Sequence, residues 1–75
     1  MVLDVFAKRL RAYRKLKSLT QEEFAQAMGV SVAVAGGWER GTRTPTDQQV
    51  RSMEELFQVN RKELGLDLLY GGEMT

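Results

Sequence analysis

The chain has 75 residues, a formal net charge of +1 and 43 % hydrophobic residues, so it is expected to form one small domain with a modest core. It contains neither cysteine nor histidine, which excludes disulfides, zinc fingers, thiol nucleophiles and imidazole bases. We therefore expect no metal, no cofactor and no catalytic residue. No apolar run approaches the ~20 residues of a membrane span, and the absence of cysteine fits a reducing compartment, so a cytoplasmic protein without membrane contact is predicted.

Charge is distributed unevenly along the chain, although its sum is small. Residues 1–20 carry six bases against one acid, and residues 21–39 hold three glutamates and no base. Residues 40–51 return to a local charge of +2, and residues 52–75 sum to −3. Basic segments on both sides of an acidic one favour one charged face over a uniformly charged protein. A solvated helix face explains the same pattern.

Two helices are predicted in the first part of the chain. Apolar residues at three- and four-residue steps indicate a helix from about residue 3 to residue 17. Thr20 and Glu23 have the spacing of a capping box, which starts a second helix over residues 21–28. Gly29 suits the left-handed residue that ends this helix.

A third helix follows after a short turn. Ser31 is placed to cap it, and Gly41 suits its end, so the predicted helix covers residues 31–39. Gly36 and Gly37 lie in its interior, and each costs about 1 kcal/mol relative to alanine. This helix is therefore expected to be weak or to begin late.

The last part of the chain predicts two more helices. TDQQ at residues 46–49, directly after Pro45, is a second capping box in front of an apolar stripe. NRKE at residues 60–63 places Asn60 as the N-cap of a short final helix. No segment alternates with the period of a strand for long. The predicted fold is all-α, a compact bundle of about five short helices.

The connection between the second and third helices is short and contains glycine. A turn of this kind suits a helix-turn-helix, whose second helix enters the major groove of DNA, although a helical corner in any small bundle is similar. The segments LTQEEFAQAMGVS and WERGTRTP resemble the phage-repressor/Cro-like, XRE-type helix-turn-helix domains of regulators. The resemblance covers residues 6–64 and implies a lambda-repressor-like bundle that binds double-stranded DNA.

The resemblance implies roles for four side chains outside the loop. Arg14 and Glu39 match an ion pair that ties the first helix to the end of the third. Gln21 matches a residue that contacts a DNA phosphate at the start of the second helix, where free N–H groups attract anions. Trp38 matches an apolar anchor in the core.

The loop after the third helix matches a segment that lies along the sugar–phosphate backbone. The predicted phosphate contacts in it are two guanidiniums and two hydroxyls, those of Arg40, Thr42, Arg43 and Thr44. Such contacts orient a protein on DNA without recognising sequence. An ordinary hydrophilic loop has the same composition.

Five residues match the positions that face base edges, and they are Ser31, Val32, Ala33, Gly36 and Gly37. Relatives usually carry polar side chains at the last four, because base edges are recognised by donors and acceptors. Valine and alanine offer only apolar contact, and glycine offers only its backbone. Three hypotheses stay open: binding through phosphates and DNA shape, specificity from flanking residues in a dimer, or docking of a protein in place of DNA.

The function expected from the sequence is a DNA-binding transcriptional regulator, a repressor, that acts as a homodimer. The alternative is a helix-turn-helix scaffold for a protein partner, as in an adaptor or an antitoxin-type module. Residues 1–75 are expected to form one domain with a core of about 6–64, and the apolar tail 65–75 either packs against the first helix or forms the dimer contact. No enzymatic activity is expected, because adjacent carboxylates such as Glu22 and Glu23 point apart on a helix.

Overall fold

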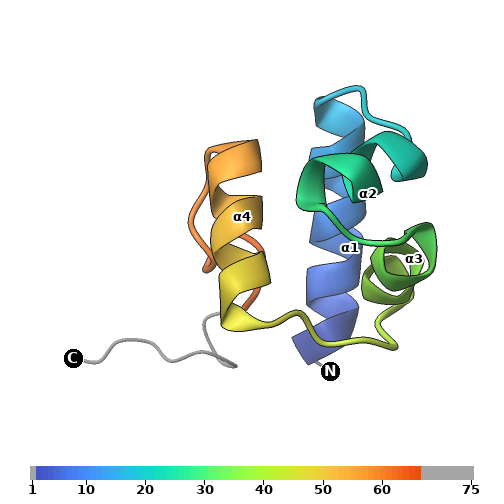
Figure 1. Ribbon diagram of the computed structural model, residues 1–75. Helices are drawn as coiled ribbons and strands as arrows, with labels where there is room; N and C mark the ends of the chain where they lie inside the picture. The colour runs from blue at the N-terminus through green and yellow to red at the C-terminus, as the bar shows by residue number, and fades with distance from the viewer. Residues whose placement is uncertain (1, 67–75) are drawn as a thin grey trace.

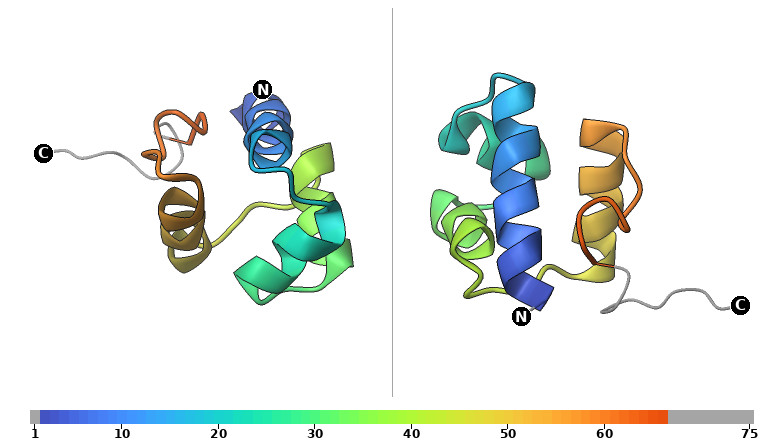
Figure 2. Two further views of the ribbon diagram at one scale, coloured as in Figure 1. Left: turned by 90° about the horizontal axis from the view of Figure 1, so that it is seen from above. Right: turned by 180° about the vertical axis from the view of Figure 1, so that it is seen from behind.

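The computed structural model describes residues 2–66 of the chain. This part contains four helices and no strand, namely α1 (Val2–Leu16), α2 (Gln21–Met28), α3 (Val32–Arg40) and α4 (Asp47–Phe57) (Figure 1). The all-α prediction is confirmed, with four helices in place of about five. Helix α3 packs against α1 and α2, and α2 also contacts α4. Figure 2 shows α2 and α3 together on one side of α1, with α4 on the other side. None of the described helices is long and apolar enough to span a membrane.

Helix α2 has the predicted bounds because both of its ends are fixed by local hydrogen bonds. The Thr20 hydroxyl accepts from the Glu23 N–H at 3.0 Å, and the Glu23 carboxylate accepts from the Thr20 N–H at 2.8 Å. Gly29 adopts a φ of 69° after the last turn, a conformation that glycine takes without steric cost. The Val30 N–H then donates to the Ala25 carbonyl at 3.0 Å, which closes the turn toward α3.

Helix α3 does not begin late, contrary to one alternative of the sequence prediction. It begins at Val32, directly after Ser31, whose hydroxyl accepts from the Val34 N–H at 3.1 Å. It continues through the two glycines and ends at Gly41, which has a φ of 75°. The burial of Ala35 and Trp38 on the inner side of the helix offsets the low helix propensity of the glycines.

The predicted fifth helix is wrong: residues 60–63 form a capped turn. Asn60 and Glu63 exchange the two side-chain hydrogen bonds of a capping motif, at 2.9 and 3.1 Å. Gly65 then takes a φ of 76°, and the Leu66 N–H donates to the Arg61 carbonyl at 2.9 Å. Because this left-handed residue follows so soon, the chain turns before further helical hydrogen bonds can form.

One apolar core joins all four helices and the final turn. Its fully or nearly fully buried members are Phe6, Leu10, Phe24, Ala25, Ala35, Trp38, Val50, Met53, Phe57, Leu64 and Leu66. Phe24 stacks on Phe57 with ring centroids 5.7 Å apart and meets the edge of Trp38 at 6.1 Å. The beginning of the apolar tail therefore packs inside the fold, whereas residues 67–75 and any dimer contact they make lie outside the described residues.

Candidate nucleic-acid interface

A buried ion pair fixes the C-terminal end of α3 to α1. Arg14 Nε donates to Glu39 Oε2 at 2.6 Å and Arg14 Nη2 donates to Glu39 Oε1 at 3.1 Å, so the pair is bidentate. The two side chains are only 13 % and 4 % exposed. Arg14 Nη1 also donates to the Leu19 carbonyl at 2.8 Å, beyond the end of α1. The structure thus contains the pair that the family resemblance implies, and adds an anchor for the segment before α2.

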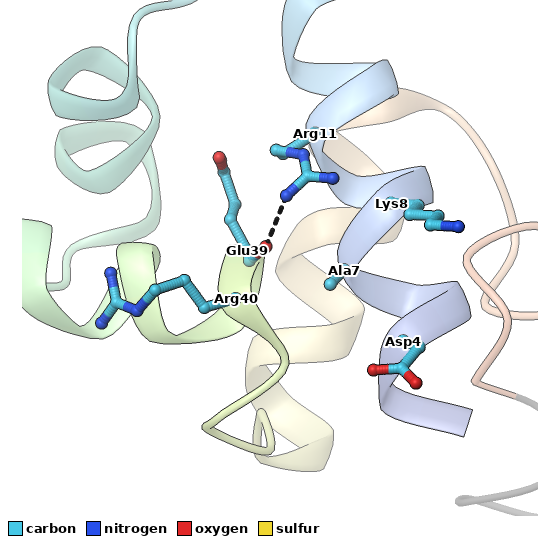
Figure 3. Close-up of a pocket in the computed structure, with 6 residues that line it drawn as sticks. All are labelled: Asp4, Ala7, Lys8, Arg11, Glu39 and Arg40. Atoms are coloured by element: carbon cyan, nitrogen blue, oxygen red, sulfur yellow. Dashed lines mark hydrogen bonds between the residues drawn. The ribbon is translucent and has the colours of Figure 1, made fainter. Parts of the chain in front are cut away.

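Two further side chains converge on Glu39. Gln21 Nε2 donates to Glu39 Oε1 at 3.4 Å, so the side chain expected at a phosphate also links α2 to α3. Arg11 Nη1 donates to the Glu39 carbonyl oxygen at 2.9 Å, as Figure 3 shows. Sequence analysis missed Arg11, although it precedes Arg14 by three residues and therefore lies on the same face of α1.

A hollow of about 280 Å³ lies between α1 and the end of α3. Its lining carries charges of both signs and consists of Asp4, Ala7, Lys8, Arg11, Glu39 and Arg40 (Figure 3). In Figure 3 the Arg40 side chain extends away from α1 and back along α3. The Arg40 guanidinium is thus directed toward the outer surface of the helix.

The first residues of α3 are open to solvent. Ser31, Val32 and Ala33 are all exposed, with Val32 at 43 %. The Ser31 hydroxyl already accepts a hydrogen bond as the helix cap, but its proton is still available to an acceptor. These three of the predicted base-facing residues are accessible, and their side chains are small and mostly apolar.

The other two predicted base-facing residues, Gly36 and Gly37, are buried beneath arginine side chains. A β-carbon added at Gly36 would lie 2.9 Å from Arg40 Nη1. A β-carbon added at Gly37 would lie 2.7 and 2.6 Å from Arg43 Cγ and Cδ. A close approach of the glycine backbone to bases would therefore require both arginine side chains to move.

The loop after α3 folds back on the same glycine pair. The Gly37 carbonyl accepts from the Thr42 N–H at 2.9 Å, from the Arg43 N–H at 3.2 Å and from the Thr42 hydroxyl at 3.2 Å. Arg40, Arg43 and Thr44 are exposed beside it, and Pro45 is buried behind them. The structure thus brings the predicted phosphate-binding loop next to the exposed side of α3.

A second charged cluster, which sequence analysis missed, lies at the final turn. Arg61 donates to Asp47 at 2.7 Å and to Glu54 at 3.2 Å, and Arg51 pairs with Asp47 at 2.9 Å. The hydrogen bond from Arg61 is the main cause that holds the pKa of Asp47 below its ordinary value. The same bond is the main cause that raises the pKa of Arg61. Because this cluster joins α4 to the final turn, it serves the fold and does not belong to the α3 surface.

Comparisons with known proteins agree with a helix-turn-helix domain. A helix-turn-helix family model matches residues 10–64. The chain is also 39 % identical over 64 residues to an uncharacterized HTH-type transcriptional regulator, YazB, of Bacillus subtilis (strain 168). That alignment covers 85 % of this chain and 93 % of the relative. No solved structure matches the chain significantly.

Proposed function

Because the chain belongs to the helix-turn-helix family of XRE type, we propose that it is a sequence-directed DNA-binding regulator that represses transcription as a homodimer. Helix α3 enters the major groove, and the loop of residues 41–44 lies along the phosphate backbone. Two α3 helices in a symmetric dimer would then contact half-sites about 34 Å apart. Such a regulator acts in the cytoplasm.

The observation that carries this proposal is the α3 surface, defined here as Ser31, Val32, Ala33, Arg40 and Arg43. All five residues are exposed, and two are cations. Glu39, the one acidic residue in α3, is buried and paired with Arg14, so its charge is compensated within the protein. A smooth helix with positive charge at its end suits a groove between phosphates.

The proposed phosphate contacts differ in how freely they can form. Arg40, Arg43 and Thr44 are exposed, and Gln21 lies at the N-terminus of α2, where main-chain N–H groups attract anions. The Thr42 hydroxyl donates to the Gly37 carbonyl, so it would have to exchange this hydrogen bond for one to a phosphate. We therefore expect Thr42 to contribute least of the five.

The alternative function is docking of a protein partner on the exposed apolar residues of α3. Val32 is the main support for it, at 43 % exposure. Single exposed apolar side chains are common on soluble proteins and do not by themselves mark an interface. The two cations on the α3 surface favour DNA over this alternative.

Selection of binding sites from random duplex DNA tests the proposed function. We expect a two-fold symmetric site, bound at least roughly 10³-fold more tightly than random duplex at the same salt concentration. Light scattering on the protein alone and on the complex gives the oligomeric state, for which a dimer on the site is expected. Equal affinity for selected and random duplexes would contradict sequence-directed binding, and no binding at low salt would favour a protein partner.

A further inference from the structure

The side chains of Arg40 and Arg43 cover the two glycines of α3. Val32, Gly36 and Arg40 follow one another at four-residue steps, so they form one stripe on the outer side of α3. A helical side chain covers the turn that precedes its own Cα. Arg40 therefore lies over Gly36, and only a residue without a β-carbon leaves room for it at this distance.

The two arginines meet the glycines with different parts of their side chains. A β-carbon added at Gly36 would lie 2.9 Å from Nη1 and 3.7 Å from Cζ of Arg40, so the guanidinium itself lies over the middle of the helix. At Gly37 the nearest atoms are Cδ, Cγ and Cβ of Arg43, so the aliphatic stem covers the backbone and the loop is held against α3. Gln21 Oε1 borders the space over Gly36 from α2.

The Arg40 guanidinium is also available for a ligand. No hydrogen bond or ion pair joins it to another residue in the described range 2–66, whereas Arg14 donates to Glu39 and to the Leu19 carbonyl. A guanidinium presents N–H donors in a planar fork, which matches the O6 and N7 acceptors of guanine in the major groove.

We propose that Arg40, held over Gly36, donates to guanine in place of the phosphate contact proposed above and so determines sequence specificity, while Arg43, held over Gly37, positions the loop for phosphate contact. This inference rests on the proposed DNA-binding function. The exposed first residues of α3 are small and mostly apolar, so the polar group that distinguishes bases would come from Arg40 in the last turn of the same helix, which lies back over glycine.

Two substitutions separate this role from a phosphate contact. Arg40→Lys keeps the positive charge but loses the planar fork, and Gly36→Ala keeps Arg40 but removes the space over the helix. For both variants we expect a dissociation constant for random duplex DNA within about threefold of that of the parent protein. The parent's preference for guanine at one position of each half-site, expected to be on the order of tenfold to hundredfold, should be lost in both.

Two matched variants serve as controls. Gly37→Ala displaces the Arg43 stem and is expected to weaken binding to all sequences while the guanine preference remains. Arg51→Lys changes an exposed arginine of α4 and should leave both quantities unchanged. Melting temperature is measured for each variant, so that a loss of guanine preference is interpreted only for folded protein. Arg40→Lys changes an exposed side chain, so we expect this variant to fold.

The measurement is the dissociation constant for the selected site, for the same site with that guanine replaced, and for random duplex. Loss of the guanine preference in Arg40→Lys and Gly36→Ala supports the inference. Retention of the preference in either folded variant, or an equal loss of affinity for every duplex, overturns it while the proposed function stands. If the parent itself binds no duplex, the proposed function fails and the inference fails with it.

Discussion

Glu39 is a buried carboxylate of α3, the helix that we propose enters the major groove, and its partners compensate its negative charge. Its two oxygens accept from Arg14 and Gln21, and its main-chain carbonyl accepts from Arg11. Helices α1 and α2 therefore both contact α3 at this one residue. Such a pair need not stabilise the protein relative to an apolar pair, but removal of one partner leaves an uncompensated buried charge.

Substitution of Arg14 tests this point. Arg14→Ala is expected to lower the free energy of unfolding by about 3 kcal/mol, because it strands the Glu39 charge in the interior. Urea unfolding at neutral pH measures the change. Arg51→Ala is the matched control, since its pair with Asp47 is exposed and should contribute at most about 0.5 kcal/mol. A loss for Arg14→Ala no larger than that of the control would contradict the structural role of the pair.

Asp47 predicts how stability changes with acid. Its pKa in the folded protein lies below its ordinary value of 3.8, mainly because Arg61 donates a hydrogen bond to it. The resulting stabilisation is present above the ordinary pKa and is lost as the pH falls through the lower, folded value. We expect Asp47→Asn to reduce the loss of stability on acidification below about pH 4, as measured by urea unfolding across pH. An unchanged acid dependence in this variant would contradict the prediction.

At the scale of elements, local chemistry explains why most helix ends could be predicted from the sequence. The capping boxes that begin at Thr20 and Thr46 and the left-handed residues Gly29 and Gly41 act within one turn, so their pattern is visible in the sequence. The prediction of a fifth helix was wrong, because Gly65 ends the final segment after one turn.

The candidate site was less predictable than the helix ends, because it depends on contacts between residues that lie more than one turn apart. The sequence and its family resemblance indicated which residues lie in and beside α3. They did not indicate that Arg40 and Arg43 cover Gly36 and Gly37, because this depends on side-chain direction and on how the loop folds back. Arg11 was missed because its acceptor is a main-chain carbonyl, which leaves no sequence pattern.

The two glycines of α3 should respond differently to alanine. Gly36→Ala is expected to raise the free energy of unfolding by about 0.5–1 kcal/mol, because alanine favours the helix and the displaced atom is the far end of Arg40. Gly37→Ala should gain less or lose stability, because the Arg43 stem must move and its loop is bonded to the Gly37 carbonyl. Thermal unfolding of both variants measures the difference, and an equal gain would contradict the close packing at Gly37.

At the scale of the whole molecule, the final turn is an integral part of the fold. Leu64 and Leu66 are fully buried, and Gly65 lies against Val5 and Phe6 of α1. Arg9 of α1 donates to the Glu63 carbonyl at 3.2 Å. The start of the apolar tail therefore stabilises the monomer, and a dimer contact would have to use other residues.

Leu66→Ala tests whether this assignment is correct. The substitution should lower the free energy of unfolding by about 3 kcal/mol, as for other buried leucines. The loss should be the same at low and high protein concentration, because the side chain is buried within one chain. Urea unfolding at two concentrations a hundredfold apart checks this, and a loss that depends on concentration would place Leu66 at a subunit interface instead.

The α3 surface and its loop are proposed to contact DNA phosphates, and the salt dependence of DNA binding tests this contact most directly. The dissociation constant for duplex DNA is measured at several salt concentrations for the parent, Arg43→Ala and the control Arg51→Ala. We predict that binding weakens as the salt concentration rises. In a plot of the logarithm of the binding constant against the logarithm of the salt concentration, the slope should be smaller in magnitude by about 1 for Arg43→Ala and unchanged for Arg51→Ala. Binding that is absent at low salt, or a slope that Arg43→Ala leaves unchanged, would contradict the account.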